Sequence, residues 1–218
     1  MSKTIILIHG AWHGGWCFDQ VTAPLREQGY EVHAPDLPFS GQQDDFQAAR
    51  ALIAAHPGAV VLGHSYGGAV ITAACQGLDV SHLVYLCAFV GEPADDTTPV
   101  ATTSALRKAL RPADGRLSVD PQLGVEVFYQ DCPAEAIAAA QLKLRSMVMG
   151  DLPAVEGVPA WQVIPSTYVV CTEDNAIPVD DQRALARRCT HVVEWQVSHS
   201  PFFAAPQRMV DLLAELAA

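Results

Sequence analysis

Short, continuous apolar runs alternate along this chain with longer segments whose apolar residues recur at helical spacing. The apolar runs lie at Thr4–Ile8, Val60–Leu62, His82–Ala88 and Thr167–Cys171. Tyr30–Ala34 and His191–Val197 are two further predicted strands, which include polar residues. Continuous hydrophobicity is typical of strands that are buried on both faces, as in parallel sheets. The pattern therefore predicts a mostly parallel central sheet of about six strands.

The segments between these runs predict helices. Helical spacing marks residues 16–28, 44–55, 66–76, 178–188 and 206–216. Pro24 predicts a kink or break in the first helix, and Gly29 is expected to cap its end. In the last helix Met209 and Leu213 belong to one apolar stripe. Strands that alternate with helices indicate an α/β fold with both faces of the sheet covered.

The middle of the chain, at about 91–165, does not continue the alternation of strand and helix patterns. Loop-like sequences such as Arg111–Gly115 separate short helical patterns at 104–110, 121–129 and 133–144. No segment here has the pattern of a strand that would continue the sheet. Because 218 residues suit one domain with a full core, we expect a single domain, 1–218, with this segment inserted over one end.

Charge and hydropathy narrow the classes of partner. Acidic residues outnumber basic ones 24 to 13, so the net charge is −11. This balance argues against nucleic acids and anionic membranes as partners, because both attract a basic face. Ile5–Ile8 is too short for the core of a signal peptide, and Leu83–Val90 is far too short to span a membrane. We expect a cytoplasmic protein, with a homodimer left open.

Metal and redox chemistry are not indicated. The six cysteines include no C-x-x-C pair, and in a reducing compartment they are expected to be buried apolar residues. His9 and His13 are four residues apart, but they flank a glycine turn and not a helix face, and no glutamate lies between them. We therefore expect neither a metal nor a cofactor.

The sequence Gly63-His64-Ser65-Tyr66-Gly67 follows an apolar run and precedes a helix of small residues. G-x-S-x-G between a strand and a helix is the pattern of a nucleophile elbow, in which the serine hydroxyl points out of a sharp turn. A Cβ at either glycine would collide with the turn. Ser65 is therefore the candidate nucleophile.

A serine hydroxyl needs a base, and the base needs a third group that orients it. Asp174 follows the predicted strand that ends at Cys171, and His199 follows the one that ends at Val197. Both lie at the carboxyl edge of the sheet, in the chain order Ser, acid, His of this type of site. Glu173 is the alternative acid.

Acyl transfer also needs donors for the oxyanion that forms on the substrate. The residue after the nucleophile, Tyr66, is expected to supply one backbone N–H. The second is expected from the glycine-containing loop after the first strand, with Ala11 as the donor.

These motifs resemble those of the α/β-hydrolase superfamily. The resemblance is carried by the stretches 9–16, 34–38 and 171–178, by the elbow and by His199. The elbow belongs to the whole superfamily, whereas 9–16 and 171–178 are specific to the group of plant methyl esterases, plant hydroxynitrile lyases and related bacterial esterases. The resemblance favours Asp174 over Glu173. It implies a serine carboxylesterase without a cofactor, acting on a small-molecule ester under a helical cap. Trp12, Phe89 and Phe202 adjoin the catalytic loops and are candidates for the pocket lining, with a purely structural role equally open.

Two other functions stay open. Hydroxynitrile lyases resemble one another in a threonine and a lysine at the positions held here by Gly10 and Ser200, which makes a lyase the weaker reading. A ligand-binding receptor on a hydrolase fold is the second alternative. A haloalkane dehalogenase needs a carboxylate where this chain has Ser65. The ester itself, or a thioester or lactone in its place, is not specified by the sequence.

Overall fold

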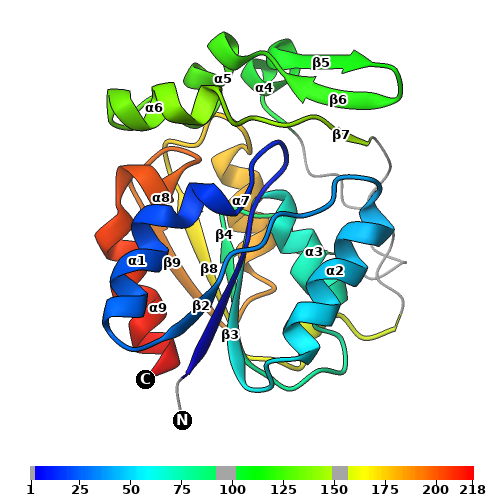
Figure 1. Cartoon of the computed structure of the whole chain (residues 1–218), viewed down its shortest axis with the longest axis vertical. Helices are drawn as coiled ribbons and strands as arrows, with labels where there is room; N and C mark the ends of the chain where they lie inside the picture. Colours follow the sequence, from blue (N-terminus) through cyan, green and yellow to red (C-terminus); the bar gives the residue numbers. More distant parts are fainter. Residues whose placement is uncertain (1–2, 92–101, 149–156) are drawn as a thin grey trace.

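The computed structural model describes residues 3–91, 102–148 and 157–218. Its centre is a parallel six-stranded sheet with the strand order β2-β1-β3-β4-β8-β9 (Figure 1). The strands are β1 Thr4–Ile8, β2 Glu31–His33, β3 Ala59–His64, β4 Val80–Leu86, β8 Ser166–Cys171 and β9 His191–Trp195. The predicted sheet is confirmed. The apolar run of β1 has its four residues Ile5–Ile8 fully buried, as a strand covered on both faces requires.

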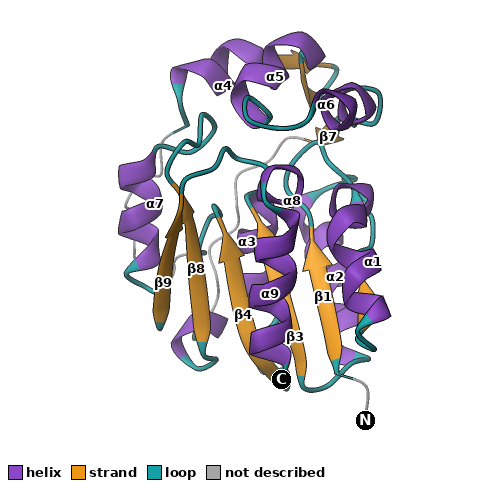
Figure 2. Ribbon diagram, turned by 90° about the vertical axis from the view of Figure 1, so that its left-hand side faces the viewer, coloured by secondary structure: helices purple, strands orange, loops and turns teal. Residues whose placement is uncertain are grey.

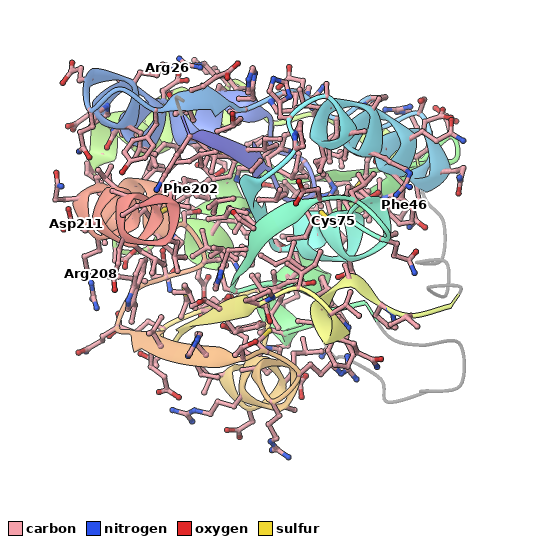
Figure 3. The ribbon with its side chains drawn as sticks, turned by 90° about the horizontal axis from the view of Figure 1, so that it is seen from below. Arg26, Phe46, Cys75, Phe202, Arg208 and Asp211 are labelled. Atoms are coloured by element: carbon pink, nitrogen blue, oxygen red, sulfur yellow. The ribbon has the colours of Figure 1, made fainter. Side chains whose placement is uncertain are left out.

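Helices cover both faces of this sheet. Seen from below, α1 and α9 lie on one side and α2 and α3 on the other (Figure 3), while α7 packs against β8. The bounds are α1 Asp19–Glu27, α2 Gln42–Ala54, α3 Tyr66–Ala74, α7 Val179–Ala186 and α9 Pro206–Ala217. The stripe of α9 is buried at Met209 and Leu213, because this face meets the sheet.

The first helix differs from its prediction. A 3₁₀ turn, Gly15–Phe18, precedes α1, so the change of geometry lies before Asp19 and not at Pro24. The helix continues through Pro24, whose carbonyl accepts a hydrogen bond from the N–H of Gln28 at 3.1 Å. Gly29 follows with φ +91°, the left-handed conformation that ends a helix at low steric cost.

The inserted segment lies above the carboxyl ends of the strands (Figure 2). It contains α4 Ser104–Ala109, α5 Pro121–Phe128 and α6 Ala134–Gln141, close to the predicted helical patterns. Asp120 caps α5, because its carboxylate accepts from the N–H groups of Gln122 and Leu123, and Pro121 occupies the first helical position.

The same segment also forms a small antiparallel sheet that the sequence analysis missed. Its strands are β5 Leu110–Ala113, β6 Arg116–Val119 and β7 Met147–Val148, in the order β5-β6-β7. The sequence Arg111–Gly115, interpreted above as a loop, is therefore one strand of a hairpin and its turn. Parts of the predicted insertion, 92–101 and 149–156, lie outside the described residues. The division into one domain with an insertion at 91–165 stays a prediction.

Short elements complete the described chain: a 3₁₀ turn at Ala160–Gln162 and a helix α8 at Pro201–Ala204, directly after the predicted catalytic histidine. Among the described residues, no helix combines the length and the hydrophobicity needed to cross a membrane.

Candidate active site

Ser65 occupies a strained turn between β3 and α3. Its backbone has φ 52° and ψ −120°, which is unusual for a residue with a side chain. A Cβ on Gly63 would come within 2.4 Å of the carbonyl oxygen of Gly67. A Cβ on Gly67 would come equally close, 2.4 Å, to the carbonyl oxygen of Ile8 at the end of β1. The predicted collisions are present, so the two glycines allow the turn to form against the sheet.

Asp174 and His199 form a buried pair at the carboxyl ends of β8 and β9. The distance from Asp174 Oδ2 to His199 Nδ1 is 2.6 Å, and both side chains are at most 2% exposed. A carboxylate accepts, so His199 Nδ1 carries the proton and Nε2 is left as the basic nitrogen. This is the arrangement that holds an imidazole ready to take a proton.

Asp174 is held by three further donors. Its Oδ1 accepts from the backbone N–H groups of Ala176, at 2.6 Å, and Ile177, at 3.0 Å. Its Oδ2 accepts from Gln182 Nε2 at 2.9 Å. Four hydrogen bonds satisfy a carboxylate that burial would otherwise destabilise.

Glu173, the alternative acid, lies elsewhere. Its side chain is exposed and accepts a hydrogen bond from Gln196 Nε2 at 2.8 Å. Adjacent residues after a strand point in different directions, and here it is Asp174 whose carboxylate reaches His199.

His64 supports the loop that carries His199. Its Nε2 lies 2.8 Å from the carbonyl oxygen of His199, and the two rings lie 4.7 Å apart between centroids. A carbonyl only accepts, so His64 Nε2 donates and Nδ1 carries a lone pair, buried without a partner in the described part of the chain. Burial holds the pKa of His64 well below 6.5, so this imidazole is neutral.

The loop after β1 is fixed by two neutral histidines. His9 Nδ1 donates to the carbonyl of Gly10 at 2.8 Å, and its Nε2 accepts from the N–H of Leu37 at 2.8 Å. His13 Nδ1 donates to the carbonyl of Ala11 at 2.8 Å, and its Nε2 lies 2.7 Å from the hydroxyl of Tyr129.

Burial lowers the pKa of His9 to about 4 and that of His13 to about 3. Every ring nitrogen of the two side chains is already bonded within the protein, so neither is free to bind a metal. They shape the turn that presents Ala11, in which Trp12 adopts φ 63°. No turn or loop carbonyl in the described chain accepts from the N–H of Ala11 or Tyr66.

Ser65, Ala11, Tyr66 and His199 line one cavity of about 280 Å³ beneath the inserted segment. The remainder of its lining is uncharged and almost entirely apolar: Trp12, Phe89, Thr102, Leu106, Leu110, Leu117, Phe128, Met147, Val148, Ala176 and Ile177. No lysine, arginine, aspartate or glutamate of the described residues lines it. The cavity can therefore hold a small neutral group against the serine.

Of the three predicted lining residues, two line the cavity and one does not. Trp12 and Phe89 face it. Phe202 is fully buried, and its ring packs at 5.4 Å from that of Phe18 and at 4.9 Å from that of Phe203. Phe202 thus fits the structural role that the sequence analysis left open, because α8 places its ring among other buried aromatic side chains.

Sequence reasoning missed residues that hold the site from outside its motifs. Gln182 on α7 is fully buried and bonds both Asp174 and the backbone of Cys171. Asp131, from the inserted segment, accepts from the N–H of Ser198. A glutamine in a helix and an aspartate in a loop carry no sequence signal for such contacts.

Four of the six cysteines are buried as predicted, whereas Cys132 and Cys189 are half-buried. Cys17, Cys75, Cys87 and Cys171 are fully buried, and all six thiols are free. Burial raises the pKa of Cys75 to about 12, which is the environment of an inert thiol.

The chain is similar to known proteins over nearly its whole length. The model of the alpha/beta hydrolase family matches residues 5–212. A pyrethroid hydrolase from Sphingobium wenxiniae is 31% identical, with 98% of this chain and 87% of that protein covered. Methylesterase 7 from Arabidopsis thaliana is 27% identical, with 99% and 96% covered.

A similar solved structure is that of a pyrethroid hydrolase from Sphingobium faniae. It has a TM-score of 0.83 and 27% identity, and the match covers 100% of this chain and 98% of that one. The likeness therefore extends over the sheet, the helices and the inserted segment together.

Proposed function

This chain belongs to the alpha/beta hydrolase family, and we propose that within it the protein is a serine carboxylesterase for small, neutral esters. The observation that carries the proposal is the cavity that Ser65 and His199 both line, with His199 hydrogen-bonded to buried Asp174. Relatives named as hydrolases and methylesterases support the same class of reaction.

In the first half of the proposed reaction, His199 Nε2 takes the proton of the Ser65 hydroxyl as its oxygen attacks the ester carbonyl. Asp174 stabilises the imidazolium that forms. The N–H groups of Ala11 and Tyr66 bind the oxyanion, and each such donor contributes on the order of a hundredfold or more in rate. The carbon–oxygen bond to the alcohol then breaks, and the alcohol leaves with the proton from His199.

In the second half, water attacks the acyl group on Ser65. His199 takes a proton from this water and returns it to the Ser65 oxygen as the acyl bond breaks. The products are a carboxylic acid and free enzyme. The uncharged aromatic side chains around His199, including Phe128, exclude bulk water and strengthen each of these interactions.

The volume and the lining of the cavity indicate the class of substrate. Its volume of about 280 Å³ is near the low end for small-molecule sites, which favours a substrate with one ring or a short chain. Without a charged lining residue among those described, a substrate carboxylate would lose hydration and gain no partner. We therefore infer that neutral esters are cleaved and esters with a free carboxylate are rejected.

The lyase alternative stays weaker. Ser200, at the position of the lysine in hydroxynitrile lyases, is fully buried and lies outside the cavity lining. Departing cyanide would thus find no cation at this position.

The test is hydrolysis of 4-nitrophenyl esters from acetate to decanoate, beside methyl salicylate, by the wild type and Ser65→Ala. We expect activity with short and medium acyl chains, lost by at least about a thousandfold in the variant. Glu173→Gln is the matched control for Asp174→Asn, because only the second touches His199. Full activity of Ser65→Ala would overturn the proposal. Cyanide release from mandelonitrile without ester hydrolysis would favour the lyase.

A further inference from the structure

Two histidines and a glutamate meet on the surface, far from Ser65. Glu31 and His33 are two residues apart on β2, so their side chains lie on the same face of the strand. His56 joins them from the turn between α2 and β3. One ligand atom from each of the three side chains lies within 4.8 Å of the other two.

The spacing of these atoms fits a shared ion. Glu31 Oε1 lies 3.0 Å from His33 Nε2 and 3.5 Å from His56 Nε2. Zinc bonds of about 2.0–2.2 Å in a tetrahedron place neighbouring ligand atoms roughly 3.3–3.6 Å apart. The two distances from Glu31 are therefore close to those around a shared ion, and no ligand atom of the three lies more than 4.8 Å from another.

His56 is already oriented as a ligand. Its Nδ1 lies 2.9 Å from the carbonyl oxygen of Leu52, which can only accept, so Nδ1 carries the proton. The lone pair is thus on Nε2, the nitrogen that faces Glu31. A backbone carbonyl on the far nitrogen of a histidine is a common support for metal-binding histidines.

The other two ligands need little change. His33 Nε2 lies 3.0 Å from Glu31 Oε1, which as a carboxylate oxygen accepts, so this nitrogen now carries the proton. Metal binding requires the His33 proton to move to Nδ1. The side chain of His33 is 30% exposed, so water can accept from that nitrogen.

We propose that Glu31, His33 and His56 form a binding site for a divalent transition metal such as Zn²⁺, with water completing the coordination. Two imidazoles select against Ca²⁺ and Mg²⁺, which prefer oxygen ligands. The site differs from the buried group of His64, Cys87 and His199, which belongs to the candidate active site.

The position of the site indicates its effect. Glu31 begins β2, the edge strand of the sheet, and pairs with Thr4 at the start of β1. His56 lies just before the start of β3. These are the amino ends of the strands, whereas Ser65 lies at the carboxyl end. An ion here would join the three-residue edge strand to the end of α2 and stabilise the fold without contacting the reaction centre.

The test uses Zn²⁺ and metal-free protein, with binding measured by calorimetry and the melting temperature recorded with and without the ion. Co²⁺ in place of Zn²⁺ gives an absorption spectrum that reports nitrogen and oxygen ligands. We expect one high-affinity ion per chain and a higher melting temperature. His33→Gln and His56→Gln are each expected to weaken binding by at least about tenfold and remove the thermal shift.

Two control variants keep the proposal falsifiable. His191→Gln alters an exposed histidine on β9 and is expected to bind Zn²⁺ like the wild type. His199→Asn removes a ligand from the active-site group and should also leave the affinity unchanged. The proposal is wrong if the wild type takes up no ion. It is equally wrong if His199→Asn abolishes binding, or if His33→Gln and His56→Gln both retain it.

Discussion

The carboxylate of Asp131 accepts a hydrogen bond from the backbone N–H of Ser198 at 2.8 Å, one residue before His199. Asp131 belongs to the segment above the sheet, directly after α5, whereas Ser198 follows β9. The hydroxyl of Ser198 also donates to the carbonyl of Phe128, at 3.2 Å. The loop that carries His199 is thus held by Asp131 and Phe128 of the inserted segment and, on its other side, by His64.

Asp131→Ala is expected to lower kcat for ester hydrolysis by about tenfold, with KM nearly unchanged. This matches the ~1.4 kcal/mol expected for one charge-assisted hydrogen bond that fixes the geometry of the base. Steady-state kinetics on a 4-nitrophenyl ester measure both constants. Asp131→Asn keeps an acceptor oxygen and should retain most of the activity; an equal loss in both variants would contradict the positioning role.

Stability should fall in acid because His9 and His13 are buried as neutral imidazoles. Their pKa values are lowered from 6.5 to about 4 and about 3, so the unfolded chain takes up protons first as the pH falls. The contribution of each neutral imidazole to the free energy of unfolding is complete above pH 6.5. It is lost between pH 6.5 and about 4 for His9, and between pH 6.5 and about 3 for His13. Each costs on the order of 1.4 kcal/mol per pH unit within its window.

Urea unfolding at pH 7.5, 6.0 and 5.0 measures this dependence. His13→Gln removes one titrating group while an amide keeps hydrogen-bonding capacity toward Ala11 and Tyr129. The variant is expected to be less stable at pH 7.5 but to have a shallower loss toward pH 5.0. A slope equal to that of the wild type would show that His13 is not the source.

Phe202 and Phe89 are expected to respond in opposite ways to truncation. Phe202→Ala opens a void in the core and should lower the free energy of unfolding by about 3–5 kcal/mol, with KM of the folded enzyme little changed. Phe89→Ala removes cavity lining and should shift the preferred acyl chain length at nearly constant stability. Thermal unfolding and the ester series separate the two; a reversed outcome would return Phe202 to the pocket.

Two glycines offer a matched pair for the elbow. Gly67→Ala places a Cβ 2.4 Å from the carbonyl oxygen of Ile8, a backbone atom that cannot move aside, so folding should fail or activity should vanish. Gly124 lies inside α5, where an added Cβ meets nothing nearer than 3.6 Å. Gly124→Ala is expected to stabilise by about 0.5–1 kcal/mol. Soluble yield and melting temperature check both.

The four central strands of the large sheet, β1, β3, β4 and β8, were predictable because each is mostly apolar and buried. The edge strands β2 and β9 contain polar residues and were recognised by their alternation with helices. The strand boundaries shifted by a residue or two, as with β4, which begins at Val80 and not at His82. The hairpin of the inserted segment was missed although Asp114-Gly115 is a strong hairpin turn. Both residues have positive φ, 49° and 71°, as such a turn requires. The strand was missed because a proline, here Pro112, argues against a strand. Pro112 is tolerated because β5 lies at the edge of its sheet.

The residues of the candidate site were predictable where they follow a strand of the parallel sheet in the chain order Ser, acid, His. Ser65, Asp174 and His199 each come directly after a strand, and parallel strands bring such residues to one edge. Gln182 was not predictable, because its role depends on how α7 packs against the loop after β8. The orientation of Phe202 depends likewise on α8, a helix too short to leave a periodic pattern.

The hydrogen bonds of Arg145 limit how the inserted segment can be exchanged in protein engineering. Its guanidinium donates to the carbonyl oxygens of His13 and Leu37, and its N–H donates to that of Trp12. The inserted segment thus helps to hold the loop that contains Ala11. Grafting the corresponding segment of a relative to change substrate range would remove this support, unless an arginine at the equivalent position were transplanted with it. The inserted segment and the loop after β1 therefore have to be exchanged together in such a design.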